Sequence, residues 1–350
     1  MQYMKAGKKR IGQGGPVFIV AELSGNHNGD IKHALRIIDA AADAGADAVK
    51  LQTYTPDTIT INSNRPEFVI KSSNKAWRDK TLYELYGEAY TPWQWHRRLY
   101  AHAKRRGLVC FSSPFDTTAV VFLQKLGNPI YKVASFEVVD IPLLEAIGKT
   151  RKPVIMSRGM STKAELALAI KTLRKFGTKD IVLLQCVSAY PAKPGDMHLA
   201  NISDLRKQFK VAAGLSDHTQ SNDVAVAAVA LGAVVIEKHL TLKRSDGGPD
   251  ASFSMEPHEF KALVASVRAT EAAVGEPSYA LSGGEKENLH FRKSLFVVKD
   301  IKKWERFTKE NIRSIRPGNG MAPKFYRFVL GKRAAKDIKR ATPMRHALIA

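Results

Sequence analysis

The sequence predicts an α/β protein, a (β/α)₈ barrel followed by a small separate domain. Eight apolar runs rich in β-branched residues recur along the chain, and each has the length of a buried strand. Helix-like patterns separate the runs, and this alternation favours a parallel sheet. The series extends from residue 16 to residue 275, and a closed barrel of eight such units has about 250 residues.

The strand and helix signals can be placed by residue number. The eight runs lie at 16–23, 47–54, 107–114, 128–135, 153–160, 180–190, 211–217 and 233–241. Helices are predicted at 30–46, 161–177 and 255–275. In the first helix Asp30 is the expected N-cap and Gly45 lies near the end. In the second, Ser161 lies near the start and Gly177 follows the last turn.

Segments that depart from the repeat indicate the domain organisation. Residues 55–92 form a long excursion after the second run, and insertions of this kind lie over the active-site face of a barrel. We expect a barrel domain over 1–275, a linker over 276–290 and a small domain over 291–350. The last segment has short β-like pieces and a turn rich in Gly and Pro.

Composition narrows the class of protein. The chain has 350 residues, 44% of them hydrophobic, which is enough for a full core. It has no long uninterrupted apolar run, so we expect no membrane partner, and no apolar segment follows the basic N-terminus as a signal peptide requires. Cys110 and Cys186 lie inside strand-like runs and are expected to be buried thiols. These features predict a cytoplasmic protein.

The formal charge of +22 is concentrated in the tail, because residues 291–350 contain 17 Lys and Arg against 4 Asp and Glu. A basic nucleic-acid-binding module is therefore a second hypothesis, and it requires aromatic residues among the cations. The tail contains Phe291, Phe296, Trp304, Phe307, Phe325, Tyr326 and Phe328. A small domain also needs aromatic residues for its core, and no RNA-binding motif is present. We expect no nucleic acid partner.

Polar residues end nearly every predicted strand, where the active site of a barrel lies. They are Glu22, Lys50, Gln52, Ser112, Ser113, Lys132, Ser135, Ser157, Ser188, Tyr190, Asp217, His218, Glu237, Lys238 and His239. A buried Lys costs several kcal/mol unless an anion pairs with it. Each Lys could pair with a structural carboxylate, but several around one mouth favour an anionic ligand. The chain has no glycine-rich phosphate loop, so a small substrate is expected rather than a nucleotide.

Two histidines end consecutive strands, His218 after the seventh run and His239 in the eighth. Neighbouring strands lie about 4.8 Å apart, so both side chains can reach one metal ion. Nitrogen and oxygen ligands without Cys suit Mn²⁺ or Mg²⁺. His27 has three interpretations: it could bind substrate, orient Glu22 or hold its turn. The other histidines on helix-like segments are expected at the surface: His33, His96, His102 and His258.

Several short motifs together resemble the sialic acid synthase family. They are AELSGNHNGD, KLQTY, SSPFD, YKVASFE, SAYPA, GLSDHT, IEKHLTL and GGPD. The tail, WERFTKENIRSIRPGNGMAPKF and then VLGKRAAKDIKRATPM, resembles the antifreeze-like SAF domain of that family. The resemblance covers nearly the whole chain. It implies a TIM barrel with a β-clip SAF domain, and a transferase that condenses phosphoenolpyruvate with an N-acetylated amino sugar.

The resemblance also implies residue roles. A divalent metal on His218 and His239 polarises the aldehyde of the open-chain sugar, and C3 of phosphoenolpyruvate attacks it. Water that is either bound to the metal or directed by Glu22 then adds at C2, and phosphate leaves. The implied phosphoenolpyruvate-binding residues are Lys50, Ser113, Lys132, Ser135, Ser157, Ser188 and Ser216. The implied sugar-binding residues are Gln52, Glu137, Tyr190, Asp250 and Arg316.

Three segments resemble members of the family that make pseudaminic acid: TLYELYGEAYTPWQWH, TLKRSDGGPDASFSMEP and SIRPGNG. Ser188 stands where members that make N-acetylneuraminate tend to carry Asn, whereas AKPGDMH departs from the pseudaminate pattern. N-acetylneuraminate and legionaminic acid remain the alternative products. In the family, the arm that carries Arg316 comes from the partner subunit of a domain-swapped homodimer.

Overall fold

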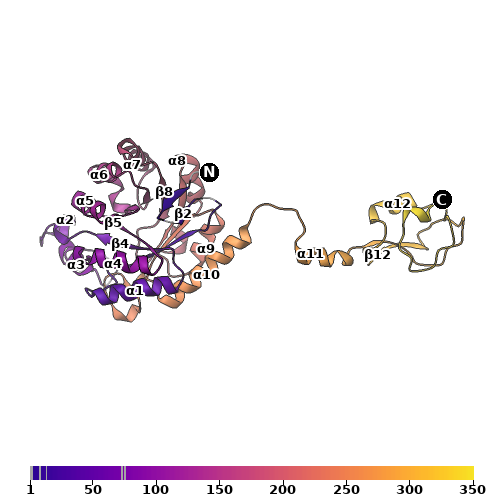
Figure 1. Ribbon diagram of the computed structural model, residues 1–350, viewed down its shortest axis with the longest axis horizontal. Coiled ribbons are helices and arrows are strands. Elements are labelled where there is room, and N and C mark those ends of the chain that lie inside the picture. Colours follow the sequence, from indigo (N-terminus) through magenta and orange to yellow (C-terminus); the bar gives the residue numbers. More distant parts are fainter. Residues whose placement is uncertain (1–2, 8, 13, 72–73, 75) are drawn as a thin grey trace. The chain divides into compact units, whose positions relative to one another are not determined.

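The computed structural model describes residues 3–7, 9–12, 14–71, 74 and 76–350, and divides the chain into the units Met1–Gly275 and Glu276–Ala350. In the first unit eight parallel strands close into a barrel in the order β10-β3-β4-β5-β6-β7-β8-β9 (Figure 1). Each predicted run contains one strand, so the predicted barrel is confirmed. The strands are β3 Phe18–Glu22, β4 Ala48–Thr53, β5 Val109–Pro114, β6 Tyr131–Val133, β7 Val154–Ser157, β8 Ile181–Cys186, β9 Ala212–Asp217 and β10 Val235–His239.

Helices surround the barrel, as Figure 1 shows. They are α1 Ile31–Asp43, α4 Trp93–Arg105, α5 Thr117–Leu126, α6 Ile141–Lys149, α7 Lys163–Phe176, α8 Asn201–Phe209, α9 Asp223–Ala230 and α10 Pro257–Val274. The prediction that Asp30 caps the first helix is confirmed, since its side chain accepts from Lys32 N at 2.8 Å. The cap of α7 is Thr162, which forms a capping box with Glu165.

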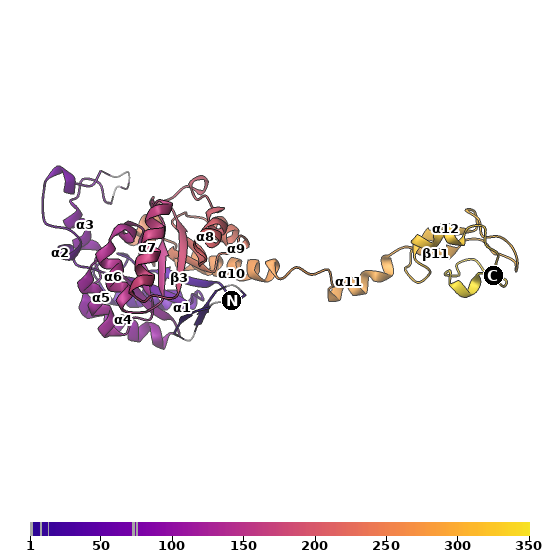
Figure 2. The same ribbon diagram turned by 90° about the horizontal axis from the view of Figure 1, so that it is seen from above.

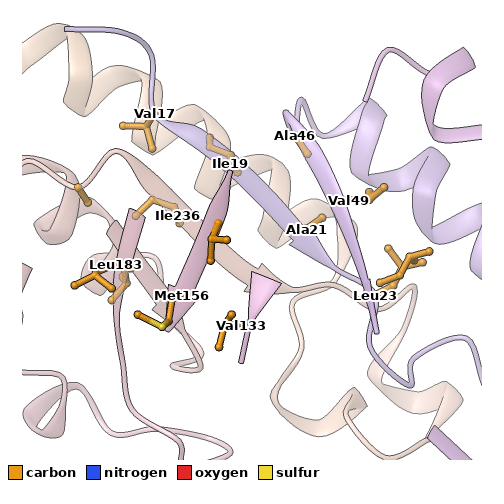
Figure 3. Packing of buried hydrophobic residues seen from close by; sticks show 14 of the residues in the cluster. Val17, Ile19, Ala21, Leu23, Ala46, Val49, Val133, Met156, Leu183 and Ile236 are labelled. Atoms are coloured by element: carbon orange, nitrogen blue, oxygen red, sulfur yellow. The ribbon is translucent and has the colours of Figure 1, made fainter. Parts of the chain in front are cut away.

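The two faces of the barrel strands differ in a regular way. Outward side chains pack against the helices, and Figure 3 shows ten labelled residues of this cluster, among them Ile19, Val49 and Ile236. Inward side chains are apolar near the start of each strand, where Phe18, Val20, Ala48, Phe111, Ile130, Ile155, Val182, Leu184 and Val235 form a second cluster. With a side-chain period of two, the next inward positions are polar, for example Glu22 after Val20 and Lys132 after Ile130. The carboxyl end of the barrel is therefore lined by charge.

A hairpin at the N-terminus, which the strand signals did not predict, covers the apolar end of the barrel interior. Its strands, β1 Met4–Ala6 and β2 Lys9–Ile11, are antiparallel, and Met4 and Ile11 belong to the interior cluster. Lys9 pairs with Asp47 at the start of β4. The hairpin could not be predicted because three-residue strands are too short to show an alternating pattern in the sequence. Burial of Met4 and Ile11 in the interior cluster packs the hairpin against the barrel.

Arg268 on α10 joins three elements at this end. Its guanidinium donates to Asp47 Oδ2 and to Val17 O, each at 2.8 Å, and to Glu271 at 2.9 Å. Asp47 Oδ2 also accepts from the backbone of Ile19 at 2.9 Å. The last helix of the barrel is thereby bonded to its first two strands.

Replacing Arg268 with alanine is expected to lower the free energy of unfolding of the barrel by roughly 1–3 kcal/mol, because Asp47 and the Val17 carbonyl lose a charged donor. The measurement is denaturant unfolding followed by tryptophan fluorescence. Lys261→Ala, an exposed residue of the same helix, is the matched control. Equal midpoints for the two variants would show that the contacts are not stabilising.

The excursion after β4 is ordered by two short helices, α2 Pro56–Ile59 and α3 Leu82–Ala89. Figure 2 shows this segment extending beyond the ring of helices. A bridge between Val69 and Thr81 closes its base, and Thr81 and Glu84 form a capping box at the start of α3. Because the excursion leaves the carboxyl end of a strand, it begins at the polar mouth of the barrel.

The second unit has its own core. Its strands β11 Ser294–Val297 and β12 Ile312–Ile315 are antiparallel, and α12 Tyr326–Val329 packs with them through Val329. The segment predicted as a linker contains α11 Gly283–Glu287. Phe307 is buried in the core, whereas Phe291, Trp304 and Phe328 are exposed. Among the described residues of both units, none of the helices is long and apolar enough to cross a membrane.

Candidate active site

A cavity of about 360 Å³ opens at the carboxyl end of the barrel strands. It brings together twelve residues from six strands and the loops after them. Eleven of these were predicted as site residues, and the twelfth, Glu237, was identified from its position in the strand. They are Lys50, Gln52, Lys132, Ser135, Glu137, Ser157, Tyr190, Ser216, His218, Glu237, His239 and Asp250. Of the other predicted residues, Glu22 contacts Lys50, Ser188 contacts Ser135, and Ser113 is the strand neighbour of Gln52. Arg316 lies in the second unit.

Lys50 and Lys132 are buried beside two carboxylates. Lys50 Nζ lies 2.6 Å from Glu22 Oε2 and 3.2 Å from Glu237 Oε1. Lys132 Nζ lies 3.6 Å from Glu237 Oε1 and donates to Ser157 Oγ at 2.8 Å. The sequence left open the alternative that each Lys pairs with a carboxylate of the protein, and the structure shows such pairs for both lysines. This pairing does not exclude a ligand, because Lys50, Lys132 and Glu237 also line the open cavity.

The pKa directions set the sign of the charge in the cavity. Burial would raise the pKa of Glu237, but the ammonium groups of Lys132 and Lys50 hold it at about 2. Burial raises the pKa of Glu22, and the nearby Glu237 adds to that effect although Lys50 opposes it. Burial lowers the pKa of Lys132, although Glu237 opposes that shift. The cavity wall therefore holds two lysines beside one firmly ionised carboxylate and one carboxyl group whose pKa is raised. The site can thus accept an anionic ligand.

Serine hydroxyls surround the two lysines. Ser216 donates to Glu237 Oε1 at 3.1 Å, and the Oγ atoms of Ser135 and Ser188 lie 2.8 Å apart. Ser113 Oγ is buried without a hydrogen-bond partner among the described residues. Buried hydroxyls are nearly always satisfied, so an unsatisfied one next to a cationic cavity indicates that a ligand completes the site.

His218 and His239 lie side by side, with ring centroids 5.4 Å apart. His218 Nδ1 donates to Val187 O at 2.9 Å, and the ring is also hydrogen-bonded to Cys186. His239 Nδ1 lies 3.1 Å from Ser24 Oγ, and burial, with His218 adding, lowers the pKa of its ring. A neutral imidazole oriented through Nδ1 is the form that binds a divalent cation. The two rings therefore fit the predicted metal.

These two imidazoles could hold a divalent cation, whereas no group of three or more His, Cys, Asp or Glu side chains placed to hold a metal ion is found among the described residues. Burial would lower the pKa of His218, but Cys186 beside it raises that pKa. Cys186 is a buried free thiol, as predicted. It also lines the cavity, which the sequence did not predict.

Three polar residues at the strand ends face away from the cavity. Lys238 Nζ lies 2.7 Å from Asp217 Oδ2 and donates to Thr219 O at 2.6 Å, on the outer side of the barrel. Ser112 Oγ lies 2.6 Å from Thr53 Oγ1. Lys238, Asp217 and Ser112 are each next in sequence to a predicted site residue or to Glu237. Successive side chains of a strand point to opposite faces, so these three lie on the outer face and their neighbours face the candidate site.

The excursion supplies a wall that the sequence did not predict. Trp77 Nε1 donates to Pro249 O at 2.7 Å, and its ring packs against Tyr190 with centroids 5.4 Å apart. Asp250, the next residue, accepts from Gly25 N at 3.2 Å. Trp77 thus fixes the loop that presents Asp250. No periodic pattern surrounds Trp77, and its position in an excursion over the predicted active site is the only signal that could have identified it.

Glu137 is the carboxyl group whose ionisation changes near neutral pH. Burial raises its pKa to about 7, although Lys132 opposes the shift. Its Oε2 atom is buried without a hydrogen-bond partner among the described residues. A carboxyl group with such a pKa can accept or release a proton at neutral pH.

The predictions for the other histidines need one correction. His96 and His33 are buried rather than at the surface, because α4 and α1 pack these faces on the barrel. His96 Nε2 lies 2.8 Å from Thr53 Oγ1. His27 is buried and its Nδ1 accepts from Gly29 N at 3.1 Å, so it holds its turn, which is the structural one of the three interpretations.

The free energy of unfolding is expected to fall as pH is lowered from about 6.5 to 4. Burial lowers the pKa of both His27 and His96 to about 4, so the unfolded chain binds protons in this window and the folded chain does not. The loss is about 3 kcal/mol at most for each residue. Denaturant midpoints measured across this range should depend less on pH in His96→Gln than in the wild type. His258→Gln, which changes an exposed histidine, is the control and should show the pH dependence of the wild type. Equal pH dependence in all three proteins would contradict the assignment.

Comparisons with known proteins agree with this geometry. The sequence profile of the NeuB family matches residues 37–279, and that of the SAF domain matches residues 292–350. The chain is 46% identical to a pseudaminic acid synthase of Campylobacter jejuni over 92% of this chain and 94% of that protein. It is 38% identical to an N,N'-diacetyllegionaminic acid synthase of the same species, over 92% and 96%.

A solved structure shares this fold. It is the N-acetylneuraminic acid synthetase from Leptospira borgpetersenii in complex with citrate, with a TM-score of 0.72, 33% identity, and coverage of 83% of this chain and 96% of that one. The family profile covers most of the barrel, and the curated relatives are similar over nearly the whole chain. The chain belongs to the NeuB family.

Proposed function

We propose that the chain is a pseudaminic acid synthase, which condenses phosphoenolpyruvate with 2,4-diacetamido-2,4,6-trideoxy-L-altrose and water to give pseudaminic acid and phosphate. The observation that carries the proposal is the 46% identity to a pseudaminic acid synthase over nearly the full length of both chains. The lower identity, 38%, to a legionaminic acid synthase favours this sugar over the nearest alternative.

The cationic cavity suits phosphoenolpyruvate. Lys132, Ser113, Ser135 and Ser157 are proposed to bind its phosphate, and Lys50, Ser188 and Ser216 its carboxylate. The two groups are bonded to the same carbon in this substrate, either directly or through one oxygen. The 2.8 Å hydrogen bond between Ser135 and Ser188, one from each set, supports such close binding of the two.

The sugar is proposed to bind between the two histidines and the aromatic wall. Gln52, Glu137, Tyr190 and Asp250 supply polar contacts. The wall includes Trp77, Tyr86 and Phe115, and it suits the acetamido methyl groups and the deoxygenated C6 of the sugar.

In the reaction, C3 of phosphoenolpyruvate forms a bond to the aldehyde carbon and the aldehyde oxygen gains a proton. Water adds at C2 and loses a proton, which leaves a hydroxyl there. The bond between C2 and the phosphate oxygen then breaks as this hydroxyl becomes the C2 ketone and gives its proton to the departing phosphate. A divalent cation, Mn²⁺ or Mg²⁺, on His218 and His239 would polarise the aldehyde. Lys50 and Lys132 offset the negative charge of phosphoenolpyruvate, and Glu22 or Glu137 holds the exchanged proton.

The test is phosphate release measured with phosphoenolpyruvate and each of three sugars, the proposed one, N-acetylmannosamine and the legionaminic acid precursor. Turnover with the first sugar at the highest kcat/KM is expected. Turnover with N-acetylmannosamine alone would refute the choice of sugar and leave the chemistry intact. Absence of turnover with all three would refute the reaction itself.

A further inference from the structure

A second cavity lies at the opposite end of the barrel from the candidate active site. It has a volume of about 430 Å³ and lies among the first residues of β8 and β9, the last turns of α7 and α8, and the N-terminal hairpin. Since the strands are parallel, their amino-terminal ends share this face, whereas the cavity with the two histidines lies at their carboxyl ends. The two cavities have no lining residue in common.

The lining of this cavity is mostly apolar or charged, and it also includes the hydroxyl of Ser203. Met4, Ile11, Ile181 and Val182 form a buried apolar floor. Five cations form the rim: Arg174, Lys179, Arg206, Lys207 and Lys210. One carboxylate, Asp180, lies among them. The rim therefore carries four more positive than negative charges around a cavity of small-molecule size.

The helix dipole explains only some of these cations. Basic residues in the last turn of a helix are favourable, and Arg174, Arg206 and Lys207 occupy such turns. Lys179 instead lies in the loop before β8, and Lys210 is a C-cap in the left-handed region with φ of 54°. α4 and α5 carry basic residues in their last turns that line neither cavity, Lys104 and Lys125. Helix ends alone do not account for five cations around one cavity.

We propose that this cavity binds a small anion whose phosphate or carboxylate group contacts the basic rim and whose uncharged body rests on the apolar floor. Like charges around one cavity repel each other, and an anion among them removes that repulsion. The floor offers no hydrogen-bonding side chain, so the part of the ligand that lies on it is apolar. The site is independent of the reaction at the other end of the barrel.

Phenyl phosphate is a probe with both features. Isothermal titration of the full chain is expected to show a binding site whose Kd is at least tenfold weaker in Lys179→Gln/Lys210→Asn. Asn tolerates the left-handed conformation at 210, so this variant removes charge without straining the backbone. Lys104→Gln/Lys125→Gln removes the same charge from exposed positions on other helices and is the matched control. The thermal midpoint should rise with phenyl phosphate in the wild type and the control, and less in the first variant.

Phosphate groups could also enter the candidate active site, and Lys132→Met distinguishes the two cavities. Binding that survives in Lys132→Met and is lost in Lys179→Gln/Lys210→Asn supports the proposal. No detectable binding by the wild type at millimolar phenyl phosphate would overturn it. Full binding in Lys179→Gln/Lys210→Asn, or equal weakening in the control pair, would overturn it as well.

Discussion

Replacing His218 or His239 with alanine is expected to reduce phosphate release by about a thousandfold or more, because a bound divalent cation contributes several kcal/mol to the transition state. The two rings lie 5.4 Å apart and orient their Nδ1 atoms through Val187 O and Ser24 Oγ. Either variant therefore removes one of only two imidazoles. The affinity for Mn²⁺, measured by calorimetry without substrate, should fall in parallel.

His258→Ala is the control for this experiment, because its exposed side chain lies on α10, away from the cavity. Unfolding midpoints of the three variants show whether the barrel remains folded. Full activity, or unchanged Mn²⁺ affinity, in either His218→Ala or His239→Ala would contradict the metal assignment.

The family resemblance implies that Arg316 binds the sugar, and on that hypothesis replacing Arg316 with alanine is expected to reduce turnover about a hundredfold. Arg316 follows β12, is exposed, and forms no ion pair with a described residue. A positive side chain of this kind is available to a ligand. Arg313→Ala, an exposed arginine of the same strand, is expected to keep its activity.

Co-expression of Arg316→Ala with Glu22→Ala tests whether the arm crosses between subunits. If it does, each mixed dimer contains one site with both groups intact and one site with neither. Random pairing then restores about a quarter of the wild-type activity, since half of the dimers are mixed and half of their sites are intact. No recovery would show that Arg316 acts within its own chain, and a monomer in solution would exclude the homodimer.

Much of the barrel and the interior of the candidate site could be predicted from sequence because both follow a local period. A strand shows opposite faces at successive residues, so Glu237 and His239 share one face and Lys238 has the other. The same rule assigns Lys50 and Gln52 to the interior and Leu51 to the helices. These assignments needed only the strand and its carboxyl end.

Burial of the helix histidines could not be predicted in this way. His96 is polar and lies on a helix with low mean hydropathy, yet it is fully buried because Thr53 offers a hydrogen-bond partner at 2.8 Å. That partner is 43 residues away in the sequence. Local composition contains no information on such a pairing.

The sequence by itself determined the eight strands, their order of apolar and polar positions, and the residue types at the mouth of the barrel. Only the tertiary structure decided the pairing of Lys50 with Glu22 and Glu237, the hairpin and Arg268 at the apolar end, and the wall formed by Trp77. The physical reason is the distance in sequence between the residues that interact. Side-chain direction along a strand depends on the backbone of adjacent residues, whereas ion pairs and cavity walls depend on contacts that barrel closure creates between distant segments.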